Sequence, residues 1–144
     1  MWLRLGDLPT WFAAGGTVGA LWFTAITFRH EQTDRAASDA RFVAAWIGTE
    51  EVEEVGFEMV LPGTYPAVVM RNGSPEPVYD VDIRWSIAGD ACDPIRRDVI
   101  PPSGEDSQIV NASKARVDSI TFRDTAGRVW TRDRLGRLKQ TAGP

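Results

Sequence analysis

The sequence predicts a small antiparallel β-sandwich held at a membrane by a single N-terminal helix. Residues 8–28 carry no charge, residues 29–41 are polar and rich in helix formers, and the chain after Phe42 alternates apolar with polar residues. Alternation with period two is typical of half-buried strands, and dense turn residues between such segments are typical of sandwiches. The 144 residues suffice for one anchor and one domain of about 100 residues.

The segment Leu8–Phe28 has the length of a membrane span. A bilayer core of about 30 Å requires roughly 20 apolar residues in a helix. Trp11 and Trp22 lie toward its two ends, as in the aromatic belts of membrane helices. The segment has no polar face, which argues against a surface helix, and no Ala-x-Ala site follows it, which argues against a cleaved signal peptide. A buried or interfacial helix is the alternative.

Small residues recur at four-residue steps inside this predicted span. Gly15 and Gly19 form a GxxxG pair, and Gly16, Ala20 and Thr24 form a second ridge. Such ridges allow a second helix to approach closely, and threonine hydroxyls can donate hydrogen bonds across the contact. The pattern predicts self-association or contact with a partner helix, although these residue types are also common in membrane helices generally.

Flanking charge predicts the orientation of the chain. Arg29, Arg35 and Arg41 follow the apolar segment, whereas Arg4 precedes it. Because positive flanks favour the cytoplasmic side, the C-terminal domain is expected in the cytoplasm, at a cell membrane crossed once. The polar residues 29–41 are expected to continue the helix as a stalk.

The predicted β domain occupies residues 42–138, followed by a polar tail over residues 139–144 that is expected to fray. Two turns stand out, Asn72-Gly73-Ser74-Pro75 and Asp124-Thr125-Ala126-Gly127, because Asn, Gly and Pro favour turn conformations. About seven strands are expected among eight candidate segments, which are Phe42–Ile47, Phe57–Leu61, Ala67–Arg71, Val78–Ile87, Ile95–Ile100, Gln108–Val110, Val117–Arg123 and Arg128–Arg132.

Val78–Ile87 shows the clearest alternation in the chain. Its apolar positions are predicted to face the core, with Trp85 as the central anchor, and its polar positions are predicted to face water. The predicted inward set is Tyr79, Val81, Ile83, Trp85 and Ile87.

Charge and residue types exclude several classes of function. The formal net charge is −4, which argues against a nucleic-acid binder. His30 and Cys92 are the single histidine and the single cysteine, so a zinc site or a Ser-His-Asp triad is not expected. Asp80 and Asp82 share a strand face, but nothing in the sequence builds a cleft around them. We therefore expect no enzymatic activity, no cofactor and no bound metal.

The C-terminal part of the chain is basic where the middle is acidic. Residues 42–113 contain 4 basic and 13 acidic side chains, and residues 114–144 contain 8 basic and 3 acidic ones. Arg128, Trp130 and Arg132 alternate and therefore share one face of a strand, a candidate surface for a protein partner or for anionic lipid. Pairing with the acidic middle of the same domain is the alternative that we favour.

Two stretches resemble known proteins. VVMRNGSPEPVYDVDIRW resembles the strand–turn–strand of immunoglobulin-like modules. The predicted anchor and stalk, together with FRDTAGRVWTRDRLGRL, resemble uncharacterised single-pass membrane proteins of actinobacteria and their phages. The resemblance implies an immunoglobulin-like sandwich without the paired cysteines of antibody domains, and no defined activity follows from it.

These observations together predict a non-enzymatic, membrane-anchored binding or scaffolding protein that presents its domain to a protein partner. One alternative is an extracytoplasmic envelope or phage-exclusion component. Another is a small accessory subunit of a membrane complex, in which the helix is the functional part.

Overall fold

The computed structural model describes Thr24, Thr27, Glu31 and residues 34–52, 62–110 and 112–141. The chain divides into two compact units, Met1–Ala37 and Ser38–Pro144. In the first unit, every described residue is helical.

The predicted span lies almost entirely outside the described residues. Thr24 and Thr27 are its described positions, and both are helical and exposed. Of the predicted small-residue ridges, Gly15, Gly16, Gly19 and Ala20 lie outside the described residues, and Thr24 alone is described. Over the part of the chain that the structure describes, no helix is both long and apolar enough to cross a membrane.

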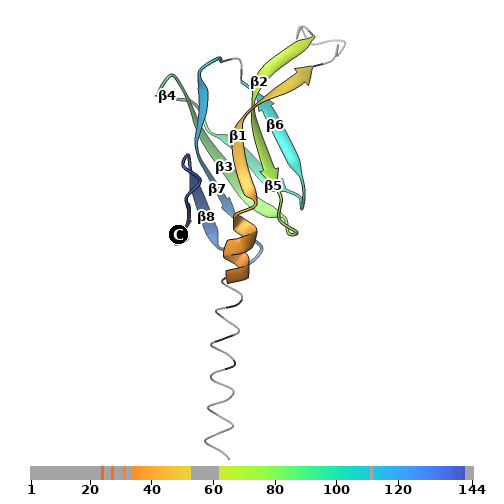
Figure 1. The fold of residues 1–144 in the computed structure, drawn as a ribbon, viewed down its shortest axis with the longest axis vertical. Coiled ribbons are helices and arrows are strands. Elements are labelled where there is room, and N and C mark those ends of the chain that lie inside the picture. Colours follow the sequence, from red (N-terminus) through yellow and green to blue (C-terminus); the bar gives the residue numbers. More distant parts are fainter. Residues whose placement is uncertain are drawn as a thin grey trace, which may run out of the picture. The chain divides into compact units, whose positions relative to one another are not determined.

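The second unit is built from β-strands, drawn as arrows in Figure 1. Most of the predicted strands are present, and several extend further than the sequence indicated. Their bounds are β1 Val43–Val52, β2 Gly63–Asn72, β3 Val78–Ile87, β4 Asp90–Ala91, β5 Ile95–Ile100, β6 Glu105–Ile109, β7 Ala115–Arg123, β8 Val129–Asp133 and β9 Leu138–Thr141.

Two antiparallel sheets pack together as a sandwich, which confirms the predicted all-β class at that level (Figure 1). The smaller sheet, which we call sheet A, has the order β1-β2-β6. The larger sheet, sheet B, has the order β4-β3-β7-β8-β9, and β5 also pairs with β3. β4 and β5 pair with successive parts of the same edge of β3, so they act as one interrupted edge strand.

The core lies between the inner faces of the two sheets. Sheet A contributes buried side chains from β1 and β2, and sheet B contributes larger ones from β7 and β8. Burial of such side chains supplies the dominant favourable term in folding. The main contributors are Val43, Val68, Met70, Val81, Ile83, Ile120, Phe122 and Trp130.

β3 does not keep the strict alternation that its sequence predicts. Its pairing with β7 shifts register between Tyr79 and Asp82, and Asp80 adopts a left-handed backbone with φ 48°. This bulge inserts one residue and reverses the face of the residues before it. Val78 is therefore buried and Tyr79 is exposed, so the prediction that Tyr79 faces the core is wrong.

Trp85 is not the central core anchor that the sequence predicted. A second register shift in the β3–β7 pairing lies between Arg84 and Trp85. Trp85 is half-buried, and its indole N–H donates a hydrogen bond to the carbonyl of Asp93 at 2.8 Å. Trp130 of β8 is the buried tryptophan, with 4% of its surface exposed.

Asn72 holds three segments together at one end of the sandwich. Its side-chain amide donates hydrogen bonds to the carbonyls of Glu76, Ile100 and Pro101, and its side-chain oxygen accepts them from the backbone and hydroxyl of Ser74. Asn72 is completely buried. The predicted Asn-Gly-Ser turn thus anchors the chain around residue 100 as well as the β2–β3 connection.

Two segments differ from the sequence prediction at their ends. β1 continues beyond the predicted end at Ile47 through Glu50 and Glu51, and the hydroxyl of Ser107 on β6 donates a hydrogen bond to Glu50. Residues 139–141 of the predicted tail, which was expected to fray, instead belong to β9 and pair with β8. Phe57–Leu61 lies outside the described residues.

Candidate functional site

A groove of about 280 Å³ lies where β1 faces β7 and β8. We call it the β1 groove. One wall comes from a strand of sheet A, and the other comes from sheet B and the turn after β8. Its lining residues are Ala44, Ala45, Trp46, Val117, Ser119, Ile120, Arg132, Asp133, Arg134 and Gly136.

β1 is an edge strand, and within the described residues β2 is its sole strand partner. The N–H of Gly73 donates a hydrogen bond to the carbonyl of Phe42, so the backbone groups of Phe42 point toward β2. This contact determines which residues of β1 bond to β2 and which do not. In an antiparallel ladder, alternate residues direct their N–H and C=O groups to opposite sides. The backbone groups of Ala45, Ile47 and Thr49 therefore point away from β2.

Arg132 forms the polar end of the groove. It lies opposite Ile120 in the β7–β8 register, so its side chain shares the inner face of sheet B. One terminal nitrogen, Nη2, donates a hydrogen bond to the carbonyl of Arg41. Its Nε is buried and has no hydrogen-bond partner in the described part of the chain. Among those same residues no carboxylate forms an ion pair with Arg132.

Burial lowers the pKa of the Arg132 guanidinium from its ordinary value. The group nevertheless stays charged at neutral pH, because the ordinary pKa of arginine lies far above that pH. The groove thus contains a partly desolvated positive charge. Such a charge is costly unless a carboxylate or phosphate approaches it.

The opposite side of the sandwich provides a direct contrast. Arg97 of β5 pairs with Val81 and also points between the sheets. Its Nε forms an ion pair with Asp106 of β6, in the other sheet, and its Nη2 lies 3.5 Å from the side-chain oxygen of Gln108. One side of the sandwich is therefore closed by an ion pair between the sheets, and the β1 groove is not.

The acidic residue in the groove, Asp133, is already engaged. One carboxylate oxygen accepts the N–H groups of Leu135 and Arg137, and the other accepts Nε of Arg137 at 2.7 Å. Partial desolvation raises the pKa of Asp133, but the hydrogen bonds from Arg137 and Leu135 outweigh it and hold that pKa below its ordinary value. Asp133 shapes the turn after β8 and stays ionised at neutral pH.

Exposed apolar side chains gather around the groove. Trp46, 41% exposed, lines it, and Leu135, 66% exposed, lies between two lining residues of the turn. Gly48 keeps space beside Trp46, since an added Cβ would lie 3.4 Å from the indole Nε1 and 2.9 Å from Val69. Phe42, 58% exposed, adjoins Arg41, whose carbonyl holds Arg132.

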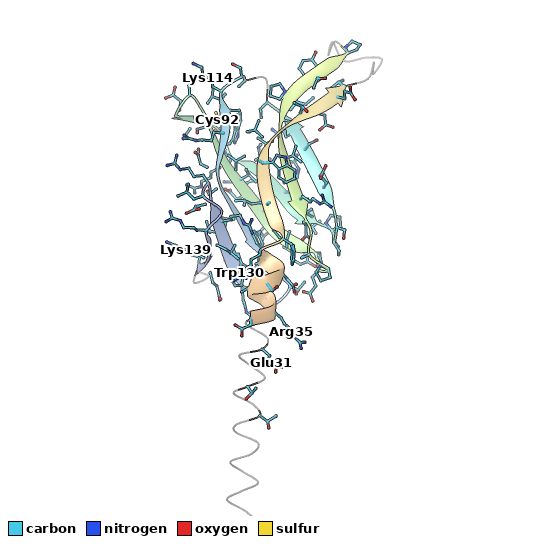
Figure 2. The ribbon with its side chains drawn as sticks, in the orientation of Figure 1. Glu31, Arg35, Cys92, Lys114, Trp130 and Lys139 are labelled. Atoms are coloured by element: carbon cyan, nitrogen blue, oxygen red, sulfur yellow. The ribbon has the colours of Figure 1, made fainter. Side chains whose placement is uncertain are left out.

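The three residues of the predicted binding face, Arg128, Trp130 and Arg132, lie in different environments and have different roles. Trp130 is buried and donates its indole N–H to the carboxylate of Asp124 at 3.0 Å, so its ring is not available to a partner or to lipid. Figure 2 shows Trp130 within the sandwich and Lys139 at its margin. Arg132 reaches the groove, and Arg128 is half-buried next to the Asp124 turn.

Asp80 and Asp82, the two carboxylates considered for acid–base chemistry, each form an ion pair with a different arginine. Asp80 forms an ion pair with Arg123, and Asp82 forms one with Arg96 at 3.1 Å. Among the described residues, no group of three or more His, Cys, Asp or Glu side chains could hold a metal ion. Cys92 is a half-buried free thiol, at the same end of the sandwich as Lys114 (Figure 2).

A further polar cluster lies where β3 meets β7. The Ser86 hydroxyl lowers the pKa of Asp118 by hydrogen bonding, burial opposes this, and Arg116 at 2.9 Å lowers it further. Arg116 also reaches Ser86 at 3.4 Å. The three side chains satisfy one another, and the cluster joins β3 to β7.

An internal repeat was missed in the sequence. Arg-Asp-x-x-Gly-Arg occurs at residues 123–128 and again at residues 132–137. In both copies the aspartate accepts two backbone N–H groups of its own turn, and the glycine has a left-handed backbone, with φ 80° at Gly127 and 79° at Gly136. The repeat would have predicted the second hairpin and with it β9.

Comparison with protein-family models, with curated proteins and with solved structures finds no match to this chain.

Proposed function

We propose that this chain is a non-enzymatic, membrane-anchored binding protein that presents an immunoglobulin-like sandwich to a protein partner. In this proposal residues 8–28 form the anchor and residues 29–41 the stalk. The domain lies on the cytoplasmic side, and the surface around the β1 groove contacts the partner.

The strand order supports an immunoglobulin-like topology. The orders β1-β2-β6 and β5-β3-β7-β8 correspond to the A-B-E and C′-C-F-G arrangements of that fold. β9 is then an addition to the second sheet. Such sandwiches carry many unrelated functions, so the site must support the function by itself.

The observation that carries the proposal is the exposed tryptophan beside the groove. Trp46 lines the groove from sheet A, and Leu135 lies in the turn after β8, between the lining residues Arg134 and Gly136. Interfaces are enriched in tryptophan and arginine, and a concave apolar site with few polar groups is typical of recognition. The Trp46, Leu135 and Arg132 side chains supply that combination.

Site-specific photo-crosslinking tests the proposed surface. Benzoylphenylalanine would replace Leu135 or Trp46 in the full chain, expressed in cells of its source, with Val99 as the matched control. Val99 is also a large apolar residue and is 49% exposed, but it lies on β5. We expect a discrete crosslinked product from the groove positions and none from Val99.

The Leu135 probe also allows a second test within the same chain. Trp46→Ala should remove the crosslink from position 135 if one partner contacts both side chains. Equal crosslinking at Val99, or a Leu135 product that is unaffected by Trp46→Ala, would contradict the proposed surface.

Orientation needs a separate measurement. Single cysteines at Leu3 and Thr125, in a Cys92→Ser background, would be labelled in intact cells with an impermeant maleimide. Thr125 is exposed in the β7–β8 turn. Labelling at Leu3 alone supports a cytoplasmic domain. Labelling at Thr125 would favour the extracytoplasmic envelope or phage-exclusion alternative.

A further inference from the structure

The free edge of β1 and the unpaired charge of Arg132 border the same groove. Ala44 and Ala45 line it from β1, and Arg132 lines it from β8. The backbone groups of Ala45, Ile47 and Thr49 point away from β2, as the ladder alternation requires. An exposed strand edge of this kind is a template for another strand.

The volume of the groove limits what can occupy it. At about 280 Å³ it lies just below the range of roughly 300–1,000 Å³ that is typical of small-molecule sites. That space suits one or two side chains of an added strand better than a large cofactor. Strand addition would place alternate side chains of the ligand toward sheet B, where Arg132 lies.

The positive charge of Arg132 determines which side chain of a ligand the groove would bind. Arg97 on the opposite side of the sandwich obtains its carboxylate from Asp106. Arg132 has no such partner among the described residues, and the acid that lines the groove, Asp133, is bonded to Arg137. A carboxylate from the ligand would supply to Arg132 what Asp106 supplies to Arg97. Charge-assisted hydrogen bonds of this type are roughly twice as strong as neutral ones.

We propose that the β1 groove binds an extended acidic peptide segment of the partner, which adds as a strand to β1 and places a carboxylate against Arg132. This inference rests on the proposed function and specifies the chemistry of its partner. Main-chain hydrogen bonds to β1 supply the affinity, and the Arg132–carboxylate contact supplies the selectivity.

Selection from a random peptide library tests this inference directly. The full chain in detergent micelles would serve as bait for phage-displayed heptapeptides, and enriched peptides would be synthesised. We expect enriched sequences with β-forming residues and a glutamate or aspartate at a fixed position. Replacing that acid by its amide should weaken binding about tenfold or more, because the charge-assisted contact is lost.

Two variants of the bait identify the contact. Arg132→Gln should bind the acidic and the amide peptide with similar, weakened affinity. Arg84→Gln is the matched control, since Arg84 is an exposed arginine on β3 that does not line the groove, and it should retain the preference for the acid. N-methylation of alternate peptide nitrogens should weaken binding if the peptide adds to β1. Thermal melts of each variant would verify folding.

The outcomes separate this inference from the proposed function. Enriched peptides without an acid, or binding unaffected by Arg132→Gln, would overturn the inference and leave the crosslinking result intact. Free acetate or glutarate that competes as strongly as the peptide would identify a small-carboxylate site, which also overturns strand addition. Absence of both peptide enrichment and groove-specific crosslinks would overturn the inference and the proposed function together.

Discussion

Arg97 and Arg132 both point between the two sheets, one at each side of the sandwich. Arg97 joins the sheets through Asp106, whereas Arg132 holds only the carbonyl of Arg41 and has a buried Nε without a partner in the described chain. The first arrangement is complete within the domain. The second arrangement lowers stability, because the Nε donor of Arg132 has no acceptor among the described residues. A destabilising group of this kind is expected where a residue serves binding rather than folding.

The largest expected effect is on the free energy of unfolding, to which Arg97 should contribute favourably and Arg132 unfavourably. Arg97→Met should lower the free energy of unfolding by about 1–2 kcal/mol, because Asp106 loses its partner and both groups are only partly exposed. Arg132→Met should leave stability unchanged or raise it by up to about 1 kcal/mol, because it removes a desolvated unpaired charge. Urea unfolding of the full chain measures both. A loss for Arg132→Met equal to that for Arg97→Met would refute the contrast.

A carboxylate introduced into the β1 groove should give Arg132 an ion-pair partner, as Asp106 does for Arg97 on the opposite side of the sandwich. Ala45 lines the β1 groove and lies opposite Met70, whose side chain belongs to the inner face. Ala45→Asp should therefore pair with Arg132, stabilise by roughly 0.5–1 kcal/mol, and abolish binding of an acidic peptide. The control Ala45→Asn has the same shape without the charge. If Asp and Asn give the same stability and the same peptide affinity, Arg132 does not sense carboxylates in the groove.

The smallest expected effect is on the pH dependence of stability and concerns Asp133, whose carboxylate accepts hydrogen bonds within its own turn. Its pKa is held below the ordinary value, so its contribution to stability is present above the unfolded pKa, near 4. That contribution is lost as the pH falls through the lower folded pKa. Asp133→Asn should therefore flatten the acid limb of a stability–pH profile below about pH 4. An unchanged acid limb would show that the turn hydrogen bonds do not require the charge.

The fold was predictable where local signals were strong. Val78–Ile87 was found with its correct bounds, and the Asp124–Gly127 hairpin was found from its turn residues. The alternation within β3 failed at Asp80 because a left-handed residue and its bulge have no distinct sequence signature when the residue is aspartate. Tyr79 was therefore assigned to the wrong face.

The candidate site depended on long-range placement that alternation could not supply. Arg128, Trp130 and Arg132 do alternate, and Trp130 and Arg132 share the inner face of β8, but the sequence cannot tell an inner face from an outer one when arginine flanks tryptophan. Arg41, just before β1, and Ala45, on β1, enter the site from far along the chain. The Arg-Asp-x-x-Gly-Arg repeat at residues 123–128 and 132–137 is the local signal in the sequence that predicts β9.

The buried position of Asn72 has a consequence for producing this protein. Asn72-Gly73-Ser74 is an acceptor triplet for N-linked glycans, yet the Asn72 amide is fully buried and donates to three carbonyls. A glycan added there before folding would replace one of the two N–H groups on this nitrogen and would have no space at the buried site. Secretion from a eukaryotic host would therefore trap glycosylated chains outside the native fold, and Ser74→Ala, which removes the acceptor triplet, would itself weaken the Asn72 network.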